Sequence, residues 1–276
     1  MINATGNRMT REIARQSGLA DQIDKLQVQI SSGKRLQRAS DDAVSWRRIA
    51  TIGKAQASAD VWQTNIASAQ ALVSQADGVL QSTSSLLIRA RELTLSAATG
   101  TLNDADRATI AAELGAIADE IDGLAARRDS NGEPLFATAD ARVMRFDSDV
   151  SFAPVPSADD VFVLGGNSLS TGLRDAAAAV TANDATAIGA SLDALNGAIG
   201  HVADRNATLG LSAGRLERLG DGLAARDITL ADERSSVEDT DLSVAIAQLN
   251  ATNLTLEAAQ AAFARINRQT LFDILG

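Results

Sequence analysis

The side chains that most often carry out catalysis are scarce in this sequence, which has one histidine, no cysteine and no tyrosine among its 276 residues. His201 has Asp204 and Arg205 close by in sequence, but no nucleophile or second histidine accompanies it. We therefore interpret His201 as a surface or interface residue. Without cysteine, thiol catalysis, disulfides and cysteine-based zinc sites are excluded.

Two further motifs could bind a phosphate or a metal ion. Residues 165–167, Gly-Gly-Asn, lack the Gly-Lys-Ser/Thr ending of a phosphate-binding loop and are interpreted as a turn. Glu238, Asp239 and Asp241 could hold calcium, but they lack the glycine turn and ligand spacing of an EF-hand, so we interpret them as an acidic start of a helix. We expect no catalytic residue, no cofactor and no metal. An enzyme acting through carboxylates of the middle segment is a remote alternative.

Charge and hydropathy exclude two classes of partner. The formal net charge is −10 and the isoelectric point is about 4.6, so a phosphate backbone would be repelled and nucleic acid is not expected as a partner. No stretch approaches the roughly 18 apolar residues of a membrane span, and residues 1–30 lack the apolar core of a cleavable signal peptide. Residues 1–60 carry a net charge of +4, whereas an acidic run precedes the last helix, so opposite charges could set the register of neighbouring segments.

Apolar residues at alternating spacings of three and four predict long helices near both ends of the chain. The longest stripe comprises Ile66, Ala69, Val73, Ala76, Leu80, Thr83, Leu87, Ala90, Thr94 and Ala97. Shorter stripes occupy residues 19–30, 110–124, 192–223 and 242–266, and a break at residues 100–103 precedes a helix that starts near Asp104 and Asp106. The pattern predicts a mainly α fold, an elongated helical bundle or coiled coil built from both chain ends.

The middle of the chain has a different composition. Residues 131–175 contain all three prolines and four of the six phenylalanines. Residues 143–146 and 161–164 are strand candidates, and residues 176–190 are expected to be helical and to lead back into the long helices. We therefore expect a small β-containing middle segment.

Several motifs at the two ends of the chain resemble those of the flagellin superfamily of bacterial flagellar axial proteins. Residues 31–36, Ser-Ser-Gly-Lys-Arg-Leu, followed by Ala-Ser-Asp-Asp-Ala at 39–43, are similar to the family's helix, Ser-Gly turn and Asp-Asp pair. Residues 63–66, 76–80, 236–242 and 256–261 fit the same pattern. The ending at residues 266–275 resembles that of the hook-filament junction proteins (hook-associated protein 3) more than that of a filament flagellin.

The resemblance implies a structural subunit that is exported unfolded, without a cleavable signal peptide, and assembles outside the cell. Its partners would be copies of itself, neighbouring axial proteins such as flagellin and another hook-associated protein, and an export chaperone. It implies three parts: residues 1–44 with 235–276 as the inner assembly core, 45–130 with 190–234 as a helical rod domain, and 131–189 as an outer segment. The expected assembly interface comprises Leu19, Ile23, Leu26, Ile30, Leu249, Leu256, Phe263, Ile266, Leu271 and Phe272.

Two other functions are compatible with the same sequence. The chain could be the flagellin that forms the filament itself. It could also be a coiled-coil adaptor that stays in the cytoplasm. Of the three, the sequence favours a subunit that joins the flagellar hook to the filament.

Overall fold

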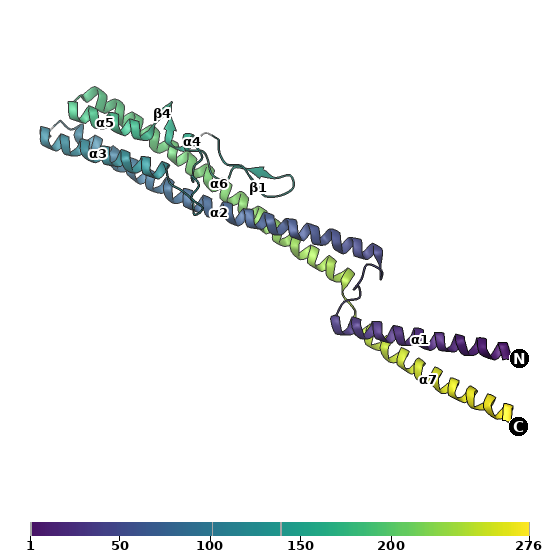
Figure 1. Ribbon diagram of the computed structural model, residues 1–276. Coiled ribbons are helices and arrows are strands. Elements are labelled where there is room, and N and C mark those ends of the chain that lie inside the picture. The colour runs from purple at the N-terminus through teal and green to yellow at the C-terminus, as the bar shows by residue number, and fades with distance from the viewer. Residues whose placement is uncertain (1, 101, 139, 276) are drawn as a thin grey trace. The chain divides into compact units, whose positions relative to one another are not determined.

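The structure is a computed structural model that describes residues 2–100, 102–138 and 140–275, with the side chains of residues 9–265 within those ranges (Figure 1). The described residues form seven helices and four short strands and the chain is 78% helical, which confirms the predicted mainly α fold with a small β-containing middle. The helices are α1 (Ile2–Ser32), α2 (Ala43–Ala97), α3 (Asp104–Ala125), α4 (Ala158–Phe162), α5 (Leu169–Ala182), α6 (Ala185–Glu238) and α7 (Leu242–Leu275). The strands are β1 (Met144–Arg145), β2 (Ser151–Phe152), β3 (Val163–Leu164) and β4 (Asn167–Ser168). Among the described residues, none of the helices is apolar over a stretch long enough for a membrane crossing.

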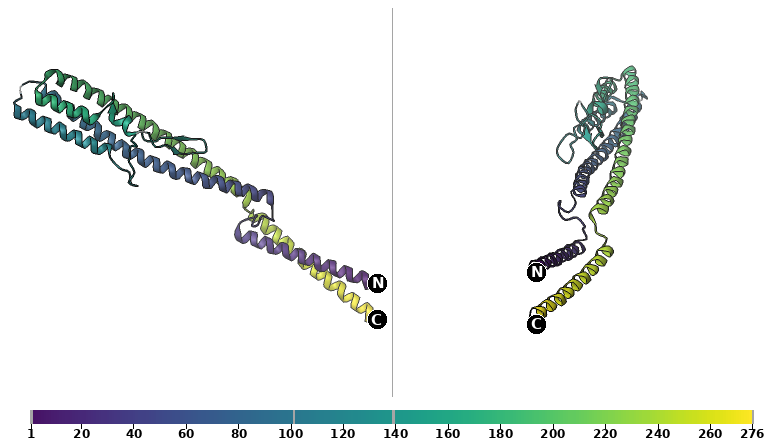
Figure 2. Two further views of the ribbon diagram at one scale, coloured as in Figure 1. Left: turned by 45° about the horizontal axis from the view of Figure 1, so that its top comes forward. Right: turned by 90° about the vertical axis from the view of Figure 1, so that its right-hand side faces the viewer.

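The chain divides into two compact units. One comprises residues 1–56 and 227–276, which we call the terminal unit, and the other comprises residues 57–226, which we call the central unit. The central unit contains the main hydrophobic core, to which α2, α3, α5 and α6 all contribute. Figure 2 shows α3 and α5 running beside the ends of α2 and α6 in this unit.

The longest stripe that the sequence predicts lies in the core of the central unit. All ten of its positions, from Ile66 to Ala97, are buried, including Thr83 and Thr94, whose side chains are fully covered. Both threonine hydroxyls donate to the carbonyl four residues earlier in α2, Thr83 to Val79 at 2.9 Å and Thr94 to Ala90 at 2.8 Å. The buried threonines therefore keep the heptad pattern without leaving an unpaired hydroxyl.

The helix ends follow from local capping residues. Gly100, at φ +69°, ends the α2 segment, and the Asn103 side chain then accepts a hydrogen bond from the Asp106 backbone N–H at 2.9 Å to start α3. The expected helical structure over 176–190 is present and leads into α6, with a break at residues 183 and 184 between α5 and α6. Asn183 adopts a left-handed conformation with φ +52°, and the Asp184 carboxylate caps α6 by accepting from the backbone N–H groups of residues 186 and 187.

The middle segment forms two short antiparallel hairpins within the central unit. β1 pairs with β2, and β3 pairs with β4 across the Gly165–Gly166 turn, where both glycines have positive φ. The strand candidate at 161–164 was half wrong, since its first two residues belong to α4. A capping box explains the difference: Ser157 Oγ accepts from the Asp160 N–H, and the Asp160 carboxylate accepts from the Ser157 N–H.

Candidate assembly surface of the terminal helices

The terminal unit is built on an antiparallel pair of long helices. α1 packs against α7, and the Ile2 end of α1 lies at the same end of the pair as the Leu275 end of α7 (Figure 1). Each helix has an apolar stripe, and a helix pair can bury only the stripe that faces the partner. The residues on the remaining faces of α1 and α7 therefore determine what else the pair can bind.

The residues predicted for the assembly interface differ in burial. Ile23 and Leu26 are buried between the helices, with 8% and 6% of their surface exposed. Five others are half-buried: Leu19, Ile30, Leu249, Leu256 and Phe263. The side chains of Ile266, Leu271 and Phe272 lie outside the described residues. The structure thus brings part of the predicted set into the seam between α1 and α7 and leaves part of it accessible to another molecule.

Large apolar side chains outside the seam are a feature that, apart from Leu242, the sequence stripes missed. Among the described residues, ten of the sixteen exposed large hydrophobic side chains belong to the smaller, terminal unit. They are Met9, Ile13, Val28, Val44, Trp46, Ile228, Leu242, Val244, Ile246 and Leu254. An apolar residue on a second face of a helix, outside its heptad stripe, is the sequence signal that could have found the other nine. Such a surface is typical of a subunit that buries it against other chains.

Residues 33–35, just after α1, lie beside residues 237–240, which end α6 and lead towards α7. We call the place where these two segments meet the crossing. Gly33, at φ +71°, turns the chain out of α1, and Lys34 then forms an isolated antiparallel β-bridge with Asp239. The Arg35 N–H donates to the Glu238 carbonyl at 2.8 Å, and the Thr240 N–H donates to the Gly33 carbonyl at 2.9 Å. Two segments more than 200 residues apart in sequence are therefore joined by paired backbone hydrogen bonds.

Glu238 is the most enclosed charged group at this crossing, with 12% of its side chain exposed. Lys34 Nζ donates to its Oε1, and Arg234 Nε donates to its Oε2 at 2.8 Å. The hydrogen bond from Lys34, followed by that from Arg234, lowers the pKa of the Glu238 carboxyl below its ordinary value. Glu238 therefore stays ionised at neutral pH, although it is nearly covered.

The Asp-Asp pair has a structural role. The Asp41 carboxylate accepts from the backbone N–H groups of Arg38 and Gln37, which lowers its pKa. Asp42 caps α2: its carboxylate accepts from the Ser45 hydroxyl and from nearby backbone N–H groups, which lowers its pKa as well. The Asp41 carboxylate therefore holds the loop of residues 37–41, and the Asp42 carboxylate starts α2.

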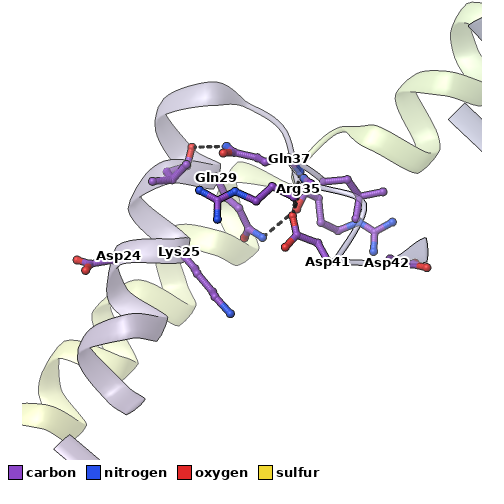
Figure 3. A pocket seen from close by; sticks show the side chains of 10 residues that line it. Asp24, Lys25, Gln29, Arg35, Gln37, Asp41 and Asp42 are labelled. Atoms are coloured by element: carbon purple, nitrogen blue, oxygen red, sulfur yellow. Dashed lines mark hydrogen bonds between the residues drawn. The ribbon is translucent and has the colours of Figure 1, made fainter. Parts of the chain in front are cut away.

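A polar hollow of about 540 Å³ lies beside this loop, between the end of α1 and residues 35–42 (Figure 3). Gln29 and Gln37 cross it with hydrogen bonds to backbone carbonyls, from Gln29 to Arg35 at 3.1 Å and from Gln37 to Val28 at 3.4 Å. Its lining holds carboxylates, amides and basic side chains, but no nucleophile next to a general base. Among the residues that the structure describes, no group of three or more His, Asp or Glu side chains is arranged to hold a metal ion.

The other residues considered for chemistry lie apart from one another. His201 is half-buried on α6, and its Nε2 atom has no hydrogen-bond partner among the described residues. Residues 165–167 form the β3–β4 turn. Asp241 caps α7 by accepting from the backbone N–H groups of residues 243 and 244, as expected for a helix start. The interpretation was wrong for the other two acidic residues, because Glu238 ends α6 and Asp239 pairs with Lys34. The geometry therefore favours packing over catalysis.

Comparisons with known proteins agree with this arrangement. The model of the bacterial flagellin N-terminal helical region matches residues 3–141, and that of the C-terminal helical region matches residues 192–275. The chain is 28% identical to the flagellar filament 30.7 kDa core protein of Treponema maltophilum over 90% of each chain. It is 33% identical to flagellar hook-associated protein 3 of Salmonella typhimurium over 45% of this chain and 39% of that one.

A solved structure has the same fold. The crystal structure of flagellar hook-associated protein 3 from Legionella pneumophila superimposes with a TM-score of 0.63 at 13% identity, covering 68% of this chain and 98% of the other. The two family models together match both long helical regions and leave out residues 142–191. The predicted family is confirmed, and the chain belongs to the bacterial flagellin family.

Proposed function

We propose that this chain is a structural subunit that joins the flagellar hook to the filament by helical self-assembly. The observation that carries the proposal is the contrast between its two units. The central unit closes its own core, whereas the terminal unit keeps ten large apolar side chains exposed. Because burying apolar surface is the main driving force of association, the terminal unit is completed by neighbouring subunits.

The position at the junction is supported by the sequence ending and by one relative. Residues 270–275, Thr-Leu-Phe-Asp-Ile-Leu, resemble the ending of junction proteins. The 33% identity over 123 residues to hook-associated protein 3 of Salmonella typhimurium favours the same position. The partners in this proposal are copies of the chain and the neighbouring axial proteins, flagellin and another hook-associated protein, with a chaperone during export.

The proposal assigns a layer to each part of the chain. Residues 1–44 and 235–276 form the inner assembly core, residues 45–130 and 190–234 form the surrounding rod layer, and residues 131–189 lie outermost. The subunit is exported from the cell and acts as a structural part of the flagellum outside it. Its β-containing segment is then the part that a label can reach in an assembled flagellum.

Labelling a single introduced cysteine tests this position. Val143 is 66% exposed in the middle segment, and the natural chain contains no cysteine, so Val143→Cys can be modified with a maleimide dye against an unreactive wild-type control. Fluorescence or gold confined to the boundary between hook and filament is the expected result. Label that stays inside cells with normal flagella would instead support a cytoplasmic adaptor.

A second candidate function is that of the filament flagellin itself. The match to the Treponema maltophilum filament core protein favours it, because that match spans 90% of each chain, whereas the match to the Salmonella junction protein spans less than half. The same labelling separates the two. Signal along the whole filament would identify a filament subunit and overturn the junction proposal.

A further inference from the structure

Two asparagines of the central unit are followed directly by glycine, in the pairs Asn131–Gly132 and Asn196–Gly197. In such a pair the backbone nitrogen of the glycine can attack the side-chain carbonyl carbon of the asparagine, because glycine has no Cβ to obstruct the approach. The attack forms a carbon–nitrogen bond and closes a ring, while the side-chain nitrogen leaves as ammonia with the proton of the attacking nitrogen. Water then breaks one of the two carbon–nitrogen bonds of the ring and leaves an aspartate or an isoaspartate.

The pair Asn196–Gly197 is protected by its helix. It lies within α6, where each backbone N–H donates along the helix axis to the carbonyl four residues earlier. Side chains project outwards from that axis, so the Gly197 nitrogen and the Asn196 side chain point in different directions. Asn196 is nevertheless exposed to solvent. Helical geometry, and not burial, therefore prevents the attack at this pair.

The pair Asn131–Gly132 lies in the loop between α3 and β1, where no helix protects it. Asn131 is exposed, and Gly132 has a positive φ of +82°. The Gly132 N–H donates to the Asp129 carbonyl at 3.0 Å and so closes a four-residue turn. For attack on Asn131, the Gly132 nitrogen must release that carbonyl, lose its proton and rotate. The rate of modification therefore depends on how often the turn opens.

The Asp129 side chain holds this turn closed. Only 1% of it is exposed, and its Oδ1 atom accepts from the backbone N–H groups of Asn131 at 2.9 Å and Glu133 at 3.0 Å. The Asp129 N–H also donates to the Glu133 carbonyl at 2.8 Å. The residues on both sides of Gly132 are thus bonded to Asp129. Its negative charge further disfavours the loss of a proton from a neighbouring amide.

The loop is also anchored beyond the turn. Arg142 lies 3.4 Å from the Asp129 carboxylate and donates to the Pro134 carbonyl at 2.9 Å. Leu135 and Phe136 follow directly and are 3% and 1% exposed in the core of the central unit. An isoaspartate at position 131 would put a side-chain carbon into the backbone, so the hydrogen-bonded turn could not re-form in its present geometry.

We propose that Asn131 is a latent deamidation site and that Asp129 is the residue that keeps it closed. The reaction needs only water, and its products are ammonia and an aspartate or isoaspartate at position 131. The inference concerns the central unit of a single chain. It is independent of the proposed assembly role, and the failure of either leaves the other standing.

Deamidation rates in the full chain and in a peptide test the closed turn without any substitution. The natural chain and a synthetic peptide of residues 127–137 are incubated in the same mildly alkaline buffer. Mass spectrometry of digested samples then follows the conversion of the amide to the acid at each asparagine. Asn131 should react at least about tenfold more slowly in the chain than in the peptide, which corresponds to about 1.4 kcal/mol. Equal rates at Asn131 in chain and peptide would overturn the proposal.

Substitution of Asp129 tests which residue protects the turn. In Asp129→Ala, the rate at Asn131 should rise towards that of the peptide, whereas Asn196 in the same sample should keep its natural rate. The matched control is Asp149→Ala, which removes an exposed carboxylate of the β1–β2 loop that accepts from the Ser148 hydroxyl and should leave Asn131 slow. An unchanged rate at Asn131 in Asp129→Ala contradicts the assignment. So does equal acceleration at Asn131 and Asn196, because it would show general unfolding in place of a local opening.

Discussion

Truncation of one leucine in each unit should separate folding from assembly. Leu209 lies in the core of the central unit and is 1% exposed, whereas Leu256 lies half-buried on α7. Leu209→Ala removes three buried carbons, worth about 2.4 kcal/mol of transfer free energy, and leaves a cavity, so the free energy of unfolding should fall by about 3 to 4 kcal/mol. Leu256→Ala should cost about 1 kcal/mol or less in the free subunit, because solvent already reaches that side chain.

Urea unfolding followed by helicity at 222 nm measures both effects. With a slope of about 2 to 3 kcal/mol per molar urea, Leu209→Ala should lower the main transition by about 1 to 2 M. Leu256→Ala should leave that transition in place, yet it should reduce incorporation into flagella. The reasoning is refuted if Leu256→Ala lowers the main transition as much as Leu209→Ala does, or if Leu209→Ala leaves it unchanged.

Three further substitutions or conditions test local features of the fold. The pKa of Glu238 is lower in the folded chain than its ordinary value of 4.5, so Glu238 binds fewer protons in the folded state than in the unfolded state. The stability that Glu238 contributes is therefore present above about pH 4.5. It is lost as the pH falls through the lower pKa of the folded state. Between about pH 6 and 3, the free energy of unfolding of the terminal helices should therefore change less with pH in Glu238→Gln than in the natural chain. Equal changes with pH in the two chains would contradict this. Ser157→Ala should cost about 1 to 2 kcal/mol by removing the capping box of α4, measured by urea unfolding against Ser148→Ala on the exposed loop. Gly33→Ala should destabilise the turn out of α1 by about 1 to 2 kcal/mol because the Gly33 φ of +71° disfavours a side chain, and unchanged stability in urea unfolding would argue against that strain.

Periodicity predicted the long helices of the central unit because their apolar residues face its core. The stripe from Ile66 to Ala97 is buried at every position, and the start of α3 follows from Asn103 and two acidic residues. Where apolar periodicity did not predict the secondary structure correctly, local backbone conformation and hydrogen bonds determine it. Asn183 in a left-handed conformation divides α5 from α6, and the Ser157 capping box makes a helical turn out of residues that have strand propensity.

The candidate surface was only partly predictable because a heptad stripe identifies one face of a helix. Ile23 and Leu26 lie on that face and are buried, whereas Ile13 and Leu254 lie outside the buried seam. The pairing of Lys34 with Glu238 joins residues 204 positions apart, which sequence spacing alone cannot match. The charge pattern indicated that neighbouring segments could set each other's register. The crossing shows that Lys34 and Glu238 are the residues of opposite charge that pair there.

Chemical accessibility in assembled flagella tests most directly whether the terminal helices form the assembly surface. Leu254 and Val143 are 68% and 66% exposed in the free chain, the first on α7 and the second in the middle segment, so cysteine variants at these positions make a matched pair. In the free subunit both cysteines should react with a maleimide at similar rates. In isolated flagella the cysteine at 143 should stay reactive and the cysteine at 254 should be protected; equal reactivity of the two in flagella would contradict the account.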